Sequence, residues 1–177
     1  MTRSVMLLRA VNVSGRNLVP MARLREVLTT SQVVCDVSTY IASGNVVCAN
    51  PEAPDAACAR VRQLINEEFG VDAPVILRSH EQLVQSVAAQ PFAEADEKLL
   101  HAMFLEGEPG AHGIDALHER LVSGEHLALV GKDLWINYSE GGVRSTKLTK
   151  AVLDRALGVA GTARNLRTVR KLIELTA

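Results

Sequence analysis

Positively charged side chains gather where two predicted helices begin, and these side chains are the best candidates for binding chemistry. The groups are Arg144, Lys147 and Lys150 at one helix start, after a Gly141-Gly142 loop, and Arg164 and Arg167 around the start of the last helix, where Asn165 is the expected cap. A helix dipole favours carboxylates, not cations, at the amino-terminal end. Free N–H groups combined with cations are suited to binding an anion. The alternative is a solvated basic surface with ordinary helix capping.

A second candidate is the polar pair Arg9 and Asn12, which interrupts the apolar run near the start of the chain. Burying a guanidinium or an amide is costly unless it is paired. In a strand, residues three apart project to opposite faces, so these two would lie on different sides of a sheet unless a bulge intervenes. Either they face a ligand, or Arg9 pairs with a carboxylate while Asn12 holds a turn. Our site hypothesis joins both candidates in one anion site between two halves of the chain, made of Arg9, Asn12, Lys147, Arg164 and Asn165.

Nucleophilic and metal chemistry have little support in the sequence. Ser43 lies in a polar hairpin tip with no G-x-S-x-G elbow, so we expect it to serve a turn. The five histidines include no pair with metal-binding helical spacing and no H-E-x-x-H motif. Cys35, Cys48 and Cys58 are scattered, so we expect reduced, small, buried apolar residues. We therefore expect neither a metal nor a cofactor.

The elements that would position these groups occur in the same order twice. In the first half, the apolar pattern predicts strands at 5–8, 37–41, 45–48 and 75–77, with helices starting at Pro20 and near Pro54. In the second half it predicts strands at 99–105, 126–130, 134–138 and 162–164, with helices around Ile114, from Leu148 and from Leu166. Strand, helix, strand, strand, helix, strand is the split βαβ order. The predicted fold is therefore α+β, with two ferredoxin-like halves that have antiparallel sheets, residues 1–90 and 91–177.

The apolar faces of these elements predict the core. Residues expected to be buried are Leu8, Leu24, Leu64, Val75, Met103, Leu117, Leu148 and Leu172. A capping box is expected at Ser79 and Gln82, before a short helix.

Charge and composition narrow the classes of function. A net charge of −1 gives no general attraction to nucleic acid or to an anionic membrane. Only 3% of residues are aromatic, which leaves little for the base stacking used by RNA-binding sheets. No apolar run approaches the roughly 20 residues of a membrane span. The three cysteines indicate no disulfide framework, so we expect a protein of the reducing cytoplasm. A nucleic-acid-binding module remains an alternative, with Arg164, Arg167 and Lys171 on one helical stripe, as does an interaction module that uses an open sheet face.

Three segments resemble the motifs of a known family. Residues 7–17 are similar to L-L-R-x-x-N-V-x-G, residues 39–47 to T-Y-I-x-S-G-N-V-V, and residues 162–169 to T-x-R-N-x-x-T-V. The chain resembles the bacterial domain-of-unknown-function family 1697. Its departures are Ala10 and Ser14 for glycine, Ala42 for glutamine and Leu166 for tryptophan. The resemblance implies a two-part α+β fold and no established activity, cofactor or catalytic residue.

The expected function is binding of a small anionic ligand that carries a phosphate or a carboxylate. The sequence names no general base, so it leaves open whether the protein is an enzyme. It also leaves the oligomeric state open.

Overall fold

Two compact units make up the part of the chain that the computed structural model describes, residues 2–177. Unit 1 runs up to Leu83 and also contains Leu172–Ala177, whereas unit 2 is Val84–Lys171. Unit 1 is therefore discontinuous in sequence. The predicted division into residues 1–90 and 91–177 stays a prediction.

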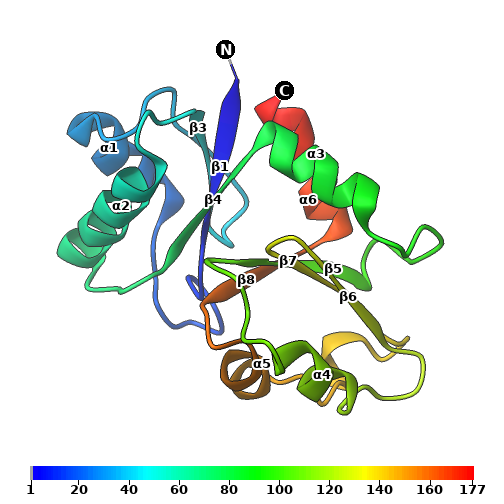
Figure 1. The fold of residues 1–177 in the computed structure, drawn as a ribbon. Coiled ribbons are helices and arrows are strands. Elements are labelled where there is room, and N and C mark those ends of the chain that lie inside the picture. Colours follow the sequence, from blue (N-terminus) through cyan, green and yellow to red (C-terminus); the bar gives the residue numbers. More distant parts are fainter. Residues whose placement is uncertain (1) are drawn as a thin grey trace. The chain divides into compact units, whose positions relative to one another are not determined.

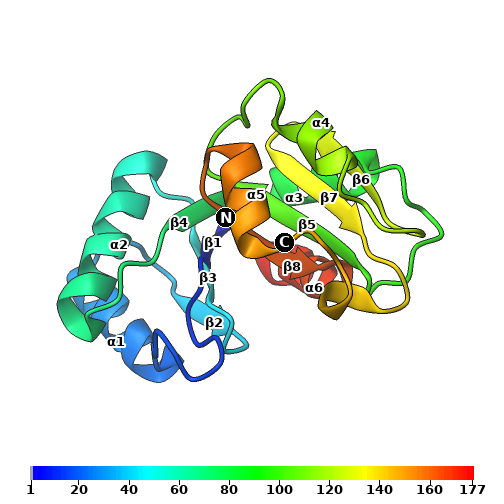
Figure 2. The same ribbon diagram turned by 90° about the horizontal axis from the view of Figure 1, so that it is seen from below.

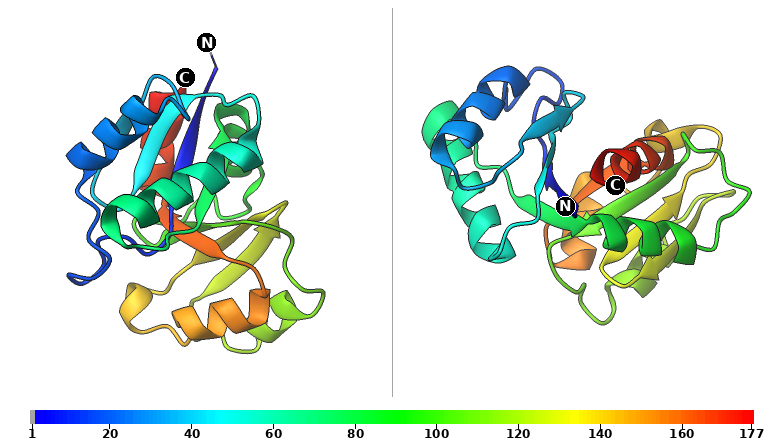
Figure 3. Two further views of the ribbon diagram at one scale, coloured as in Figure 1. Left: turned by 90° about the vertical axis from the view of Figure 1, so that its left-hand side faces the viewer. Right: turned by 90° about the horizontal axis from the view of Figure 1, so that it is seen from above.

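Unit 1 is a four-stranded antiparallel sheet with two helices on one face. Its elements are β1 (Arg3–Leu8), α1 (Met21–Ser31), β2 (Ser38–Tyr40), β3 (Asn45–Ala49), α2 (Pro54–Phe69) and β4 (Val75–Ser79). The strand order is β2-β3-β1-β4, and every neighbouring pair is antiparallel. Helices α1 and α2 lie side by side on the same face of this sheet (Figure 1 and Figure 3). Helix α3 (His80–Ala89) follows β4, and its residues from Val84 onward belong to unit 2.

Unit 2 repeats this arrangement. Its elements are β5 (Leu100–Leu105), α4 (Gly113–His118), β6 (His126–Val130), β7 (Asp133–Asn137), a short 3₁₀ turn η1 (Gly142–Arg144), α5 (Lys150–Leu157), β8 (Gly161–Asn165) and the first part of α6 (Leu166–Thr176), whose residues from Leu172 onward belong to unit 1. The strand order is β6-β7-β5-β8, again antiparallel throughout, as the strands in Figure 2 show. Both units therefore have the strand order and helix placement of a ferredoxin-like fold, which confirms the predicted fold class.

One buried cluster in each unit lies between its sheet and the two helices that connect its strands. In unit 1, Met6 and Leu8 of β1 belong to the same buried cluster as Leu24 of α1. In unit 2, Met103 of β5 shares a buried cluster with Leu153 of α5. The eight residues predicted to form the core are all buried, which confirms that part of the sequence analysis.

The single tryptophan of the chain lies on the unit 2 sheet, on the face away from α4 and α5. Trp135 of β7 is fully buried, and its indole Nε1 donates a hydrogen bond of 3.0 Å to the hydroxyl of Ser86 in α3. A buried indole N–H is costly without an acceptor, so this bond fixes α3 against that face. Tryptophan fluorescence accordingly reports on unit 2.

Local signals place the helix ends close to where the sequence predicts them. Ser79 and Gln82 form the predicted capping box: the Gln82 amide donates to the Ser79 hydroxyl at 3.2 Å, and the Ser79 amide donates to the Gln82 side chain at 2.9 Å. Pro20 differs from expectation, because it is the cap that precedes α1 and not the first helical residue. Within residues 2–177, no helix is both long enough and apolar enough to cross a bilayer.

Candidate functional site

The predicted site residues of unit 1 follow β1 and do not lie on a strand. Because β1 ends at Leu8 and Asn12 has a φ of 53°, the continuous strand on which an opposite-face placement of Arg9 and Asn12 depends is not formed. Arg9 is half-buried, and its amide donates to the Pro74 carbonyl at 3.0 Å. The chain turns at this point, so the alternation of side chains along a strand no longer applies.

The Asn12 side chain joins two loops of unit 1. Its amide nitrogen donates to the carbonyls of Val19 at 3.0 Å and Ala42 at 2.7 Å. Its amide oxygen accepts from the Val19 backbone N–H at 2.8 Å. Asn12 therefore stabilises a turn, which was the alternative to ligand binding considered from the sequence.

The same contacts bring together two of the segments that resemble family motifs, residues 7–17 and residues 39–47. The Leu8 amide donates to the Gly44 carbonyl at 2.8 Å, beside the Asn12 bond to Ala42. Gly44 has a φ of 86°, and a Cβ there would lie only 2.7 Å from the Leu8 Cβ, so the close approach requires glycine. Ser43 lies in this turn and accepts a hydrogen bond from Asn45.

In unit 2, Arg164 lies within a strand. Its guanidinium donates to the Thr162 hydroxyl and to the Ala163 carbonyl, both at 2.8 Å. Only 8% of Arg164 is exposed, and this burial lowers the pKa of Arg164 to about 10. Because Arg164 belongs to β8 and is buried, the alternative in which it shares an exposed helical stripe with Arg167 and Lys171 is wrong.

Asn165 caps the last helix as predicted. Its side-chain oxygen accepts from the Thr168 amide at 2.9 Å. Asn165 and Arg164 are consecutive strand residues that pair with His101 and Ala102 respectively, so their side chains leave the sheet on opposite faces.

The predicted cluster of cations at the start of α5 does not form. The helix begins at Lys150 and is capped by the Thr149 side chain, which accepts from the Val152 amide at 3.3 Å. Arg144 ends the η1 turn and Lys147 is exposed in the loop between that turn and the helix. Only Lys150 occupies the first turn, where its ammonium lies 3.8 Å from the Asp154 carboxylate. The helix was predicted to begin at Leu148 because that residue is apolar. Leu148 is indeed buried, but it lies in the loop before α5.

A groove that was not predicted from the sequence lies between α4 and α5. It has a volume of about 530 Å³, and its lining consists of Gly110, Ala111, His112, Gly113, Ala116, Arg120, Ala151, Val152, Arg155 and Ala156. The two helices lie side by side in Figure 1 and Figure 3. They touch at Gly113, where an added Cβ would collide with the Ala156 carbonyl oxygen. The signal available for finding this groove was small residues at 110, 111, 113 and 116 ahead of Arg120, together with alanine at 151 and 156 close to Arg155.

Three basic side chains border the groove and have no protein partner among residues 2–177. Across residues 2–177, no hydrogen bond, ion pair or ring contact engages the side chains of His112, Arg120 or Arg155. All three residues are exposed at the surface of unit 2. The groove thus combines an apolar floor with basic groups whose donors are free.

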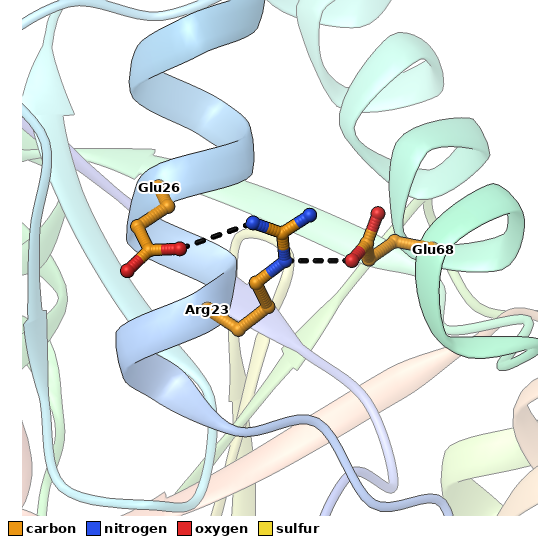
Figure 4. Close-up of polar contacts among 3 residues, drawn as sticks. All are labelled: Arg23, Glu26 and Glu68. Atoms are coloured by element: carbon orange, nitrogen blue, oxygen red, sulfur yellow. Dashed lines mark hydrogen bonds and ion pairs between the residues drawn. The ribbon is translucent and has the colours of Figure 1, made fainter.

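The corresponding helices of unit 1 show the opposite arrangement. Arg23 of α1 donates to Glu68 of α2 at 2.7 Å and to Glu26 at 3.1 Å, as Figure 4 shows. Hydrogen bonds to Glu68 and then to Glu26 raise the pKa of Arg23. Nearby, Arg62 makes two hydrogen bonds to Asp72, which lower the pKa of that carboxyl group. Carboxylates therefore neutralise the charges of Arg23 and Arg62 in unit 1. Among residues 2–177, no carboxylate pairs with Arg120 or Arg155 in unit 2.

Three further ionisable residues, His101, Tyr138 and Glu125, lie at one end of the unit 2 sheet. The His101 ring packs edge-on against Tyr138 at a centroid distance of 5.0 Å, and burial lowers the pKa of His101. Burial, followed by the charge of Glu125, raises the pKa of Tyr138 to about 12. One Glu125 oxygen accepts from the Val122 amide at 3.1 Å, and the other is buried without a partner within residues 2–177.

The cysteines come together in unit 1 although they are scattered in sequence. Cys35 is exposed, which makes the expectation of burial wrong for this residue, because Cys35 lies in the loop before β2. The Ala49 amide donates to the Cys35 carbonyl at 3.0 Å, next to buried Cys48. Burial raises the pKa of Cys48 to about 11, and Cys58 and Cys35 are among the groups whose charges contribute. No group of three metal-binding side chains within the described chain is arranged to hold a metal ion.

Comparisons with known proteins agree with this architecture. A solved structure, that of conserved bacterial protein SP0830 from Streptococcus pneumoniae, is 24% identical and matches with a TM-score of 0.78 over 99% of each chain. At that identity the likeness supports the fold alone. No curated protein matches the chain. The model of a family described as a protein of unknown function, DUF1697, matches residues 1–135. The chain therefore belongs to the DUF1697 family.

Proposed function

We propose that the protein binds a small anionic ligand in the groove between α4 and α5. The observation that carries the proposal is the set of free basic side chains at this groove, His112, Arg120 and Arg155. A guanidinium presents a planar fork of N–H donors that matches a carboxylate or a phosphate. An anion would supply the negative charge that Glu26 and Glu68 supply to Arg23 in unit 1.

The size and lining of the groove also support a small molecule. A volume of about 530 Å³ falls among those of small-molecule sites, which combine apolar walls with a few polar groups. Ala116, Ala151 and Val152 provide apolar surface, and the arginines provide charge. The five residues predicted from sequence, Arg9, Asn12, Lys147, Arg164 and Asn165, stay a prediction. Of these, Asn12 and Asn165 already use their side chains in hydrogen bonds within their own units.

A comparison of matched arginine variants tests the proposal. Thermal unfolding and isothermal titration calorimetry with phosphate, sulfate and acetate would be measured for the wild type, Arg120→Gln, Arg155→Gln and Arg23→Gln. An anion at 100 times its Kd stabilises the folded state by about 2.7 kcal/mol. We expect that gain to fall in both groove variants and to persist in Arg23→Gln, which removes the same charge from the helical layer of unit 1. Equal stabilisation of all four proteins, or of none, would overturn the proposal.

A further inference from the structure

We infer that the groove takes a linear dianion, in which two anionic groups are separated by a short apolar chain. The inference rests on the proposed anion-binding function and specifies the class of ligand. Its basis is the placement of basic side chains at both ends of the groove.

The directions of the two helices define these ends. Helix α4 follows β5 and helix α5 follows β7, and because β5 and β7 are antiparallel the two helices also run in opposite directions. The amide of Gly110 donates to the carbonyl of Leu157 at 3.1 Å, so the segment that leads into α4 meets the last residue of α5. The start of α4 therefore lies at the same end of the groove as the finish of α5.

Basic groups occupy both ends. His112 immediately precedes α4 and Arg155 lies in the last turn of α5, which places these two at the first end. Arg120 follows the finish of α4 and belongs to the opposite end. At a rise of 1.5 Å per residue, α4 alone separates Gly113 from His118 by about 7.5 Å, and Arg120 lies beyond that point. One small anion cannot lie beside both backbone positions, whereas a ligand with an anionic group at each end can.

The floor between the two ends is apolar. Ala116 of α4 faces the groove with Ala151 and Val152 of α5. Methylene groups lose no hydrogen bonds on this floor, whereas a chain of hydroxyl or amide groups would be desolvated there without partners. The lining thus favours a hydrocarbon spacer between the two charged ends.

A series of paired acids tests this inference separately from the proposed function. Succinate, adipate and suberate would be titrated calorimetrically into the wild-type protein, alongside butyrate, hexanoate and octanoate, which have the same carbon numbers but one carboxylate. We expect at least one diacid to bind about tenfold more tightly than its monoacid, because a second charged hydrogen-bonded pair is formed. We also expect an optimum chain length, because the two ends of the groove are fixed.

Arginine variants then assign the two ends. In Arg120→Gln, the diacid should lose its advantage over the monoacid, because only one end of the groove keeps its arginine. Arg155→Gln should weaken both, and Arg23→Gln should leave both unchanged; circular dichroism would confirm that each variant is folded. Equal affinities for diacid and monoacid in the wild type would overturn the dianion inference and leave the anion-binding function standing. An absence of binding for every acid, phosphate included, would overturn the function as well.

Discussion

Replacing Asn12 with alanine tests whether this side chain holds the two loops of unit 1 together. The substitution removes three hydrogen bonds, to the Val19 carbonyl, the Ala42 carbonyl and the Val19 amide. At a net contribution of about 1 kcal/mol each, their loss costs about 3 kcal/mol. Alanine must also adopt the left-handed φ of 53°, which costs about 1–2 kcal/mol more. We therefore expect the free energy of unfolding to fall by about 4–5 kcal/mol.

A second variant separates the two contributions. Asn12→Gly loses the same hydrogen bonds but adopts a positive φ without steric cost, so it should be about 1 kcal/mol more stable than Asn12→Ala. Urea unfolding followed by far-UV circular dichroism measures the free energies, and hydrogen exchange of the Val19 amide measures the local effect. If Asn12→Ala costs less than about 1 kcal/mol, which is the net value of one hydrogen bond, the reasoning is wrong. Unchanged protection of the Val19 amide would contradict it independently.

Three further predictions follow from burial and close contact. Cys35 should react with a thiol reagent in the native protein, whereas Cys48, whose pKa burial raises to about 11, should react only on unfolding; mass spectrometry of labelled peptides distinguishes them. Burial lowers the pKa of His101, so this residue takes up a proton on unfolding at mildly acid pH. The free energy of unfolding should therefore fall as the pH drops below about 6.5, and His101→Gln should make it depend less on pH in that range. Gly113→Ala should destabilise unit 2 by about 1–3 kcal/mol, measured by tryptophan fluorescence in urea, because the new methyl group would collide with the Ala156 carbonyl.

The order of elements could be predicted because its signals are local. Alternating and helical apolar patterns mark the strands and helices, and Leu24, Leu117 and Leu148 are buried as those patterns predict. The end of β1 could not be placed in the same way. Left-handed φ values at Ala10 and Asn12 turn the chain there, and neither residue type requires that conformation.

The arrangement of charges was harder to predict because it depends on contacts between distant residues. Arg23 and Glu68 are far apart in sequence, yet they form an ion pair across two helices. The groove in unit 2 likewise joins residues that follow β5 to residues of α5. The role of Asn165 as a helix cap could be predicted, because capping depends on the next three residues only.

The discontinuity of unit 1 affects how this protein is made. Residues 172–177 belong to unit 1, where the Leu175 carbonyl accepts from the Arg3 guanidinium at 3.3 Å and the Thr176 hydroxyl lies 3.1 Å from His80 Nδ1. A ribosome reaches these residues only after it has translated all of unit 2. At about 5–20 residues per second, that delay is on the order of ten seconds. During this interval the nascent unit 1 lacks its final segment, so unit 2 is the first of the two whose sequence is complete.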